Sequence, residues 1–401
     1  MSKDAKNVPA LRFKGYSDAW EKRKVSDYLC ESRIPGSNGL KAKKLTVKLW
    51  GKGVVPKNET YSGSIKTKYY VRSANQLIYG KLDFLHAAFG IVPQSLDGWE
   101  STIDSPAFDV NTSIGNAAFL LALFLKPNFY LREGIRANGS RKAKRIHEDT
   151  FLSMSISAPQ RKEQNQIAMV LDKTEFLIAA TQHKIDALEQ VKKALLQRLF
   201  DQSWRFDGYL ETWKKYRLGD HAEILTGGTP KTSVAEYWEP KSIPWMSSGE
   251  VNKVYLDQTD TMISLEGFKN SSARWIKKHS ILIALAGQGK TRGTVAVNNI
   301  ALTTNQSIAA IIPGKDLYYE FVFQNLTNRY NELRLISSGD GTRGGLNKQI
   351  VSDVTIHSPN LNEQIRIGKL LSKVDHLSTE NQLKLSRIEL IKKYLLQTLF
   401  I

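Results

Sequence analysis

Cysteine is nearly absent from this chain of 401 residues. Cys30 is its one cysteine, which excludes an internal disulfide bond and a cysteine-based metal site. No apolar run approaches the roughly 20 residues that span a bilayer, and the first ten residues lack the apolar core of a signal peptide. These absences predict a cytoplasmic protein with no membrane segment, and the length predicts two domains.

Catalytic motifs are missing as well. The segment 286–291 ends in Gly-Lys-Thr after a predicted strand, but Ala284 stands where a phosphate-binding loop needs a glycine. The Asn/Asp-Pro-Pro-aromatic tetrapeptide of adenine methyltransferases does not occur, and the histidines are scattered without metal-ligand spacing. We therefore predict no catalytic residue, no metal site and no cofactor in this chain.

Acidic residues are few relative to basic ones. The chain has 57 Lys and Arg against 39 Asp and Glu, a formal net charge of +18. Ten cations and one acid lie between Arg33 and Arg72, and six cations and one acid lie between Arg132 and Arg145. One such run is usually a solvated surface. Two runs in one domain of a basic protein favour a nucleic-acid partner, through long-range attraction and counterion release.

What the chain does have is an internal repeat. Residues 159–200 align without gaps with residues 359–400, and 17 of the 42 positions are identical. The repeat includes an entry motif: Leu-Arg-Phe-Lys-Gly-Tyr at 11–16 returns as Trp-Arg-Phe-Asp-Gly-Tyr at 204–209. A period near 200 predicts two homologous domains rather than a solenoid. The interiors, about 30–155 and 222–355, show no obvious likeness in sequence.

Both repeated segments have the periodicity of long helices. Apolar residues recur at alternating spacings of three and four, which is typical of a coiled-coil seam. We expect the two helices to pair antiparallel and to hold the two globular units a fixed distance apart, although each could instead pack on its own domain. The predicted seam comprises Leu171, Ile178, Ile185, Leu188, Leu195 and Leu199 in the first helix and Leu371, Val374, Leu385, Ile388, Leu395 and Leu399 in the second.

The two globular units read as mixed α/β. Runs rich in β-branched residues at 77–79, 281–285 and 307–312 predict strands, and segments 117–124 and 318–335 predict helices. Glycine-rich loops are frequent, as at 227–230 and 339–345. Polar loops on a small scaffold are typical of a recognition domain.

The duplicated frame resembles the specificity subunits of type I restriction–modification enzymes. The carrying residues are the entry motif with Trp20, the two helices of the pattern Pro…Glu-Gln…Lys-Lys…Leu-Leu-Gln…Leu-Phe, and Leu-Gly-Asp at 218–220 followed by Gly-Gly-Thr-Pro at 227–230. The resemblance covers nearly the whole chain. It implies target recognition domains at 1–158 and 201–358, with conserved spacer helices at 159–200 and 359–401.

The resemblance also implies a function and partners. A specificity subunit has no catalytic activity and recognises a bipartite site in double-stranded DNA. Two modification subunits that methylate adenine bind to it, and restriction subunits join them; S-adenosylmethionine, ATP and Mg²⁺ belong to these partners. Because the two interiors differ, we predict an asymmetric target. The alternatives are a coiled-coil scaffold whose basic domains bind RNA or an acidic protein, and a stand-alone nuclease or methyltransferase.

Candidate DNA contacts follow from charge and loop position. Lysines are suited to phosphate contacts, whereas Gln and Arg can read adenine and guanine edges. The candidates are Lys41, Lys43, Lys44, Lys48, Lys66, Lys68, Arg141, Lys142 and Arg145 in the first unit and Lys269, Asn270, Gln288, Lys290, Thr291, Arg292 and Arg343 in the second.

Overall fold

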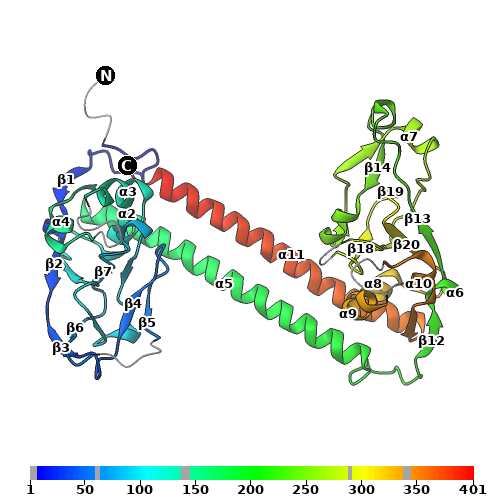
Figure 1. Ribbon diagram of the computed structural model, residues 1–401, viewed down its shortest axis with the longest axis horizontal. Helices are drawn as coiled ribbons and strands as arrows, with labels where there is room; N and C mark the ends of the chain where they lie inside the picture. The colour runs from blue at the N-terminus through cyan, green and yellow to red at the C-terminus, as the bar shows by residue number, and fades with distance from the viewer. Residues whose placement is uncertain (1–6, 59–63, 137–144, 288–290, 337–344) are drawn as a thin grey trace. The chain divides into compact units, whose positions relative to one another are not determined.

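The computed structural model describes residues 7–58, 64–136, 145–287, 291–336 and 345–401. The chain forms two compact units: unit 1 holds residues 1–182 and 383–401, and unit 2 holds residues 183–382. Each unit has a mixed α/β body and one half of each long helix, α5 (Arg161–Phe200) and α11 (Leu361–Thr398) (Figure 1). The predicted mixed α/β fold with a tandem repeat is confirmed.

Unit 1 contains a larger and a smaller sheet. The larger sheet is antiparallel, in the order β2 (Leu29–Ser32), β10 (Ala107–Val110), β7 (Leu77–Tyr79), β8 (Phe89–Ile91). The smaller sheet has the order β3 (Pro35–Asn38), β6 (Lys68–Val71), β9 (Glu100–Ser101), and β4 (Leu45–Val47) pairs with β5 (Val54–Pro56). The remaining elements are β1 (Glu21–Lys24), which pairs with β11 (Ser155–Ala158), and the helices α1 (Val25–Tyr28), α2 (Ala117–Phe124), α3 (Pro127–Gly134) and α4 (Glu148–Ser153).

Unit 2 repeats this plan with additions. Its larger sheet has the order β13 (Ala222–Thr226), β20 (Ile308–Pro313), β17 (Ile281–Ala284), β18 (Val295–Asn298), β15 (Tyr255–Leu256). Its smaller sheet has the order β16 (Thr261–Ile263), β14 (Ile243–Met246), β19 (Thr303–Thr304). The remaining elements are β12 (Lys214–Arg217), which pairs with β21 (Thr355–Ser358), and the helices α6 (Leu218–His221), α7 (Leu265–Lys269), α8 (Tyr319–Asn328), α9 (Tyr330–Leu335) and α10 (Lys348–Asp353).

The unlike interiors therefore share a strand order. The series β2-β10-β7-β8 corresponds to β13-β20-β17-β18, and unit 2 adds β15 at the edge. The smaller sheets differ more, because β6 pairs antiparallel with β9 whereas β14 pairs parallel with β19. The segment 318–335, which the sequence predicts as one helix, is divided into α8 and α9 at Arg329. The duplication thus extends from the frame into the larger sheet.

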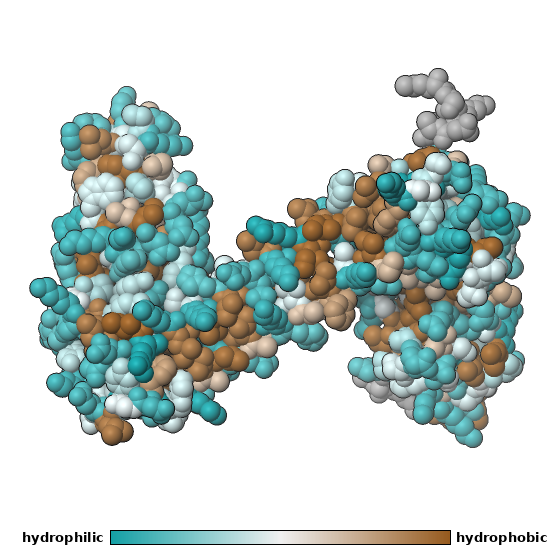
Figure 2. Space-filling view, turned by 180° about the vertical axis from the view of Figure 1, so that it is seen from behind, coloured by the Kyte–Doolittle hydropathy of each residue, from teal (hydrophilic) through white to brown (hydrophobic). Residues whose placement is uncertain are grey.

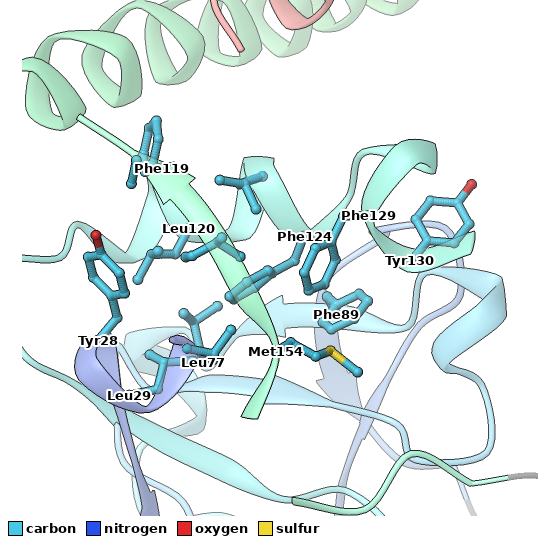
Figure 3. Packing of buried hydrophobic residues seen from close by; sticks show 14 of the residues in the cluster. Tyr28, Leu29, Leu77, Phe89, Phe119, Leu120, Phe124, Phe129, Tyr130 and Met154 are labelled. Atoms are coloured by element: carbon cyan, nitrogen blue, oxygen red, sulfur yellow. The ribbon is translucent and has the colours of Figure 1, made fainter. Parts of the chain in front are cut away.

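The core of unit 1 lies between the larger sheet and the helices α2 and α3 (Figure 3). The ring of Phe124 on α2 lies 4.9 Å from that of Phe129 on α3 and 5.8 Å from that of Phe89 on β8, measured between centroids. In unit 2 the corresponding core joins Ile283 and Ile311 of the sheet to α8. Each unit therefore buries an apolar core of its own.

The long helices contribute to both cores as antiparallel neighbours. In unit 1, Leu171 from the first half of α5 packs in one cluster with Leu399 near the end of α11. In unit 2, Leu371 from the first half of α11 packs in one cluster with Leu199 near the end of α5. All twelve residues of the predicted seam are buried or half-buried.

A phenylalanine at the end of each helix anchors the helix in the body of a unit. In unit 1 the Phe400 ring stacks 5.3 Å from Phe119 and lies 6.2 Å from Trp20. In unit 2 the Phe200 ring lies 5.5 Å from Phe321 and 6.4 Å from Trp213. The repeated Leu-Phe ending of the two helices therefore has the same structural role twice.

The entry motif is clamped by a bidentate ion pair in each unit. Arg12 donates from Nε and Nη2 to both carboxylate oxygens of Glu163, at 2.8 and 2.9 Å. Arg205 does the same to Glu363, at 3.0 and 2.7 Å. Each glutamate side chain is only 1% exposed. Paired charge-assisted hydrogen bonds of this geometry are strong and specific, so they fix the entry motif against the start of each long helix.

The polar positions of the seam form ion pairs between the helices. Lys192 of α5 pairs with Asp375 of α11 in unit 2, and Lys392 of α11 pairs with Glu175 of α5 in unit 1. These contacts form only in the observed register. Charged pairs of this kind within a helix seam favour one register of the two helices.

A buried carboxyl group lies beside the seam of unit 2. Glu320 of α8 is 4% exposed and accepts a hydrogen bond of 3.1 Å from the Tyr255 hydroxyl. Next to it, Gln324 donates to Asp375 at 2.7 Å. Burial raises the pKa of Glu320 to about 7, because desolvation disfavours the charged form.

The halves of the long helices in unit 1 also carry large apolar side chains that are exposed. Phe176 is 72% exposed and Leu390 is 68% exposed, and Leu383, Ile391 and Tyr394 are more than half exposed. In the space-filling view, hydrophobic surface gathers along the helices while most of the surface elsewhere is hydrophilic (Figure 2). Among the described residues, no helix has the length and apolar character needed to cross a bilayer.

Candidate nucleic-acid interface

In each unit several segments meet at one edge of the larger sheet, which we call the loop edge. In unit 1 it comprises residues 81–83, 102–105 and 145–146, and in unit 2 residues 226–229, 285–287, 291–293, 304–307 and 345–346. The same two backbone hydrogen bonds assemble both edges. The amides of Lys81 and Leu285 donate to the carbonyls of Asp104 and Ser307, at 2.9 and 2.8 Å. The carbonyls of Lys81 and Leu285 in turn accept from the amides of Ile146 and Leu346, at 3.2 and 2.9 Å.

Five of the lysines that the sequence predicts as DNA contacts lie on or beside the smaller sheet of unit 1. Lys41, Lys43 and Lys44 precede β4, and Lys66 and Lys68 lie just before and within β6. All are exposed except the half-buried Lys44, whose ammonium group lies 5.6 Å from the centre of the Tyr69 ring. Strand β9 of this sheet runs directly into the turn 102–105, so the lysine surface continues the loop edge.

Lys48 occupies a different place. It follows β4 in the tight connection to β5 and is exposed. Its backbone amide donates to the carbonyl of Gly53 at 2.9 Å, which closes this hairpin. Lys48 therefore lies at the loop end of the β4–β5 hairpin, away from the start of β4 where Lys41, Lys43 and Lys44 lie.

A buried arginine fixes the smaller sheet of unit 1 to the larger one. Arg72 is 2% exposed; its Nε donates to the Ser101 hydroxyl at 2.7 Å and its Nη1 to the Ser32 carbonyl at 2.9 Å. Burial lowers the pKa of Arg72 to about 10. Next to the loop edge, Lys81 and Glu148 form a buried ion pair of 2.6 Å. Arg72 and the Lys81–Glu148 ion pair hold the smaller sheet and the loop edge in a defined geometry.

Three other predicted contacts lie at the loop edges. Arg145 is half-buried and donates to Asp104 at 3.2 Å. Thr291 is half-buried on the loop between β17 and β18. Arg292 on the same loop donates to the backbone carbonyl of Arg334 at 3.4 Å. The Arg292 guanidinium therefore connects the β17–β18 loop to α9.

The remaining candidates are less central. Lys269 and Asn270 are exposed at the end of α7, and the Asn270 side-chain amide donates to Glu266 at 2.6 Å. Five candidates lie outside the described residues: Arg141, Lys142, Gln288, Lys290 and Arg343.

Two glycines allow the segments of the unit 2 loop edge to approach one another. A Cβ on Gly227 would lie 2.0 Å from the Thr304 carbonyl oxygen, and one on Gly228 would lie 2.1 Å from the Ser272 hydroxyl. The amide of Gly228 donates to the Thr304 carbonyl at 2.8 Å. The adjacent glycines at 227 and 228 are visible in the sequence as a turn signal, but the sequence does not show that they lie at the loop edge.

Sequence reasoning also missed exposed side chains at the loop edges. Gln306 is exposed, and its side-chain oxygen accepts a hydrogen bond of 2.6 Å from the hydroxyl of Thr229. Ile103 in unit 1 is 47% exposed. Near the unit 2 edge, Trp275 is 46% exposed beside Arg274 in a basic segment. No run of charged residues lies at Gln306, Thr229 or Ile103, so charge alone could not locate these three positions.

The side chains on the loop edges and on the lysine-bearing surface are of the kinds that bind nucleic acids. Amide, hydroxyl, apolar and cationic groups can contact base edges and phosphates. In the part of the chain that the structure describes, no group of three His, Cys, Asp or Glu side chains could hold a metal ion.

Comparison with known proteins identifies relatives in sequence and in fold. Residues 210–390 match the family model described as the type I restriction modification DNA specificity domain. The chain is 28% identical over 250 residues to the type I restriction enzyme EcoR124I/EcoR124II specificity subunit of Escherichia coli, a match that covers 60% of each chain. It is 31% identical over 185 residues to the MjaIX specificity subunit of Methanocaldococcus jannaschii, over 44% of this chain and 40% of the relative.

The fold agrees over a greater length. The S subunit of a type I restriction-modification system from M. genitalium superposes with a TM-score of 0.66, covering 98% of this chain and 99% of that one at 14% identity. The fold is therefore shared over nearly the whole chain, whereas the sequence match spans less than two thirds of these curated relatives.

Proposed function

We propose, from the likeness of this chain to the specificity subunits of type I restriction–modification enzymes, that it is the DNA-recognition subunit of such an enzyme. Each loop edge would read one half of a bipartite duplex target. One observation carries the proposal: the two loop edges are assembled by the same backbone hydrogen bonds but present different side chains. The same frame with different contents is what an asymmetric target requires.

The lysine surface of unit 1 supports phosphate binding. Five of the lysines lie on or beside one small sheet that continues the loop edge. Phosphate contacts position a protein on DNA without selecting sequence, and base contacts then select it. This division assigns the lysines to affinity and the loop edges to specificity.

We also propose that two modification subunits and the restriction subunits bind this chain, which carries no catalytic activity itself. S-adenosylmethionine, ATP and Mg²⁺ would belong to those partners. The duplicated frame offers two equivalent positions for two copies of one partner. The exposed apolar side chains of the long helices, such as Phe176 and Leu390, are the kind of surface that a partner covers.

The helix pair is the proposed spacer between the half-sites. Helix α5 has 40 residues, which corresponds to roughly 60 Å at about 1.5 Å per residue. Two short half-sites joined by a stiff spacer increase specificity, because binding of the second half is effectively intramolecular.

The experiment that tests this function is a methylome. The chain is co-expressed with its modification subunit in a host that lacks DNA methylation, and modified bases are mapped across the genome. We expect a split asymmetric motif with one methylated adenine in each half, absent when this chain is omitted. A complex that forms and leaves the genome unmethylated would contradict the proposal. Direct binding of the chain to RNA and not to duplex DNA would favour the scaffold alternative.

A further inference from the structure

We propose that the turn before the second strand of the larger sheet in each unit, β10 or β20, presents one base-reading side chain: Ile103 in unit 1 and Gln306 in unit 2. This inference rests on the proposed function, and it assigns opposite chemistry to the two half-sites. Gln306 would hydrogen-bond an adenine edge, and Ile103 would contact a thymine methyl group. We call the segments 102–105 and 304–307 the reading turns.

The two reading turns occupy equivalent positions in their units. Each links the last strand of the smaller sheet, β9 or β19, to the second strand of the larger sheet, β10 or β20. In each, the residue after the proposed reader accepts the hydrogen bond from the end of the neighbouring strand, Asp104 from Lys81 and Ser307 from Leu285. Ile103 and Gln306 therefore stand at the same point of the frame.

The frame needs neither of these side chains. The turn in unit 2 is held by the Asn305 side chain, which accepts from the Ser307 amide at 3.1 Å, and by backbone hydrogen bonds. The turn in unit 1 is closed by the amide of Ser105, which donates to the carbonyl of Thr102 at 3.0 Å. Side chains that are exposed and unnecessary for folding are free to differ. Here unit 2 has an amide at the position where unit 1 has an aliphatic group.

Thr229 gives the Gln306 side chain a defined orientation. Its hydroxyl donates to Oε1 of Gln306 at 2.6 Å. This leaves both hydrogens of Nε2 and one lone pair of Oε1 for a ligand. A donor beside an acceptor is the pattern that pairs with N7 and N6 of adenine in the major groove. Thr229 is thus a positioning residue for Gln306.

Ile103 has a different partner in the same groove. It is 47% exposed at the tip of a turn, beside Asp104, which is engaged by Arg145. An aliphatic side chain cannot hydrogen-bond a base edge, but it packs against the C5-methyl group that distinguishes thymine. The neighbouring cation, Arg145, would then contact a phosphate that flanks this base.

The test exchanges the two residues within the complex of this chain with its modification subunit. Methylomes are compared for the wild type, Gln306→Ile and Ile103→Gln. We expect Gln306→Ile to alter the preference at one base pair in one half of the motif, by roughly 5- to 150-fold, with the other half unchanged. Ile103→Gln should alter one base pair in the opposite half.

Thr229→Val provides the second measurement. It should weaken discrimination at the same base pair as Gln306→Ile, and Thr229→Ser should restore it, because the hydroxyl is retained. Motifs identical to wild type in both exchange variants would overturn the inference. Loss of all methylation by an assembled variant complex would also overturn it, because the residue would then serve both halves. Absence of any bipartite motif with the wild-type complex would instead reject the proposed function.

Discussion

Replacement of Arg205 by Met should release the entry motif of unit 2 from the start of α11. Glu363 is 1% exposed and receives both of its strong hydrogen bonds from Arg205, at 3.0 and 2.7 Å. Removal of one partner of a buried ion pair leaves an uncompensated charge, and the cost is about 3–5 kcal/mol. Unfolding of the whole chain is a poor readout, because two units violate two-state behaviour. Hydrogen exchange of the amides around Trp213 reports the local change, and it should accelerate roughly a hundredfold or more.

The control is the variant that lacks both charges. Arg205→Met with Glu363→Met removes the unpaired carboxylate, and apolar replacements of a buried pair are often nearly neutral. Exchange around Arg12, which has the same ion pair in unit 1, should stay at its wild-type rate. If the double variant exchanges as fast as the single one, the ion pair is not what holds the motif and this reasoning is wrong.

Three further changes have outcomes that the structure specifies. Because the pKa of Glu320 is raised from 4.5 to about 7, unit 2 should lose stability as pH rises through this window, and Glu320→Gln should stabilise it at pH 8.5 by up to about 3 kcal/mol, measured by hydrogen exchange of the amides of α8. Gly228→Ala places a methyl group against Ser272 and should cost roughly 1–3 kcal/mol, with weaker methylation of one half-site only. Lys66→Ala with Lys68→Ala should reduce the slope of log affinity against log salt by about 2 without changing the motif; a changed motif would show that these lysines read bases.

The elements with strong periodicity could be predicted from the sequence. The 3-4 spacing of apolar residues predicts the two long helices, although they begin at Arg161 and Leu361, two residues after the predicted starts at 159 and 359. The β-branched run at 281–285 is strand β17, and the segment 117–124 is α2. These elements are determined by local pattern, which is why the sequence suffices.

The loop edges could not be predicted in the same way. Ile103 and Gln306 become equivalent only when β10 and β20 occupy the same place in two sheets, and strand order is a property of long-range pairing. A search by charge finds lysines, but it overlooks an amide or an aliphatic side chain on a turn. It also proposes Arg292, whose guanidinium donates to the Arg334 carbonyl on α9 at 3.4 Å and whose role as a DNA contact stays a prediction. Base recognition depends on such placement more than on composition.

The division of the chain between the units has a consequence for the order of folding during synthesis. Unit 1 needs residues 383–401, whereas unit 2 is the continuous stretch 183–382. At about 5–20 residues per second, a ribosome takes roughly 10 to 40 s to make the intervening 200 residues. For that time the site on Phe119 and Trp20 that receives Phe400 is open. The first domain to leave the ribosome is therefore the last to be completed, and in the interval it presents an apolar surface to chaperones.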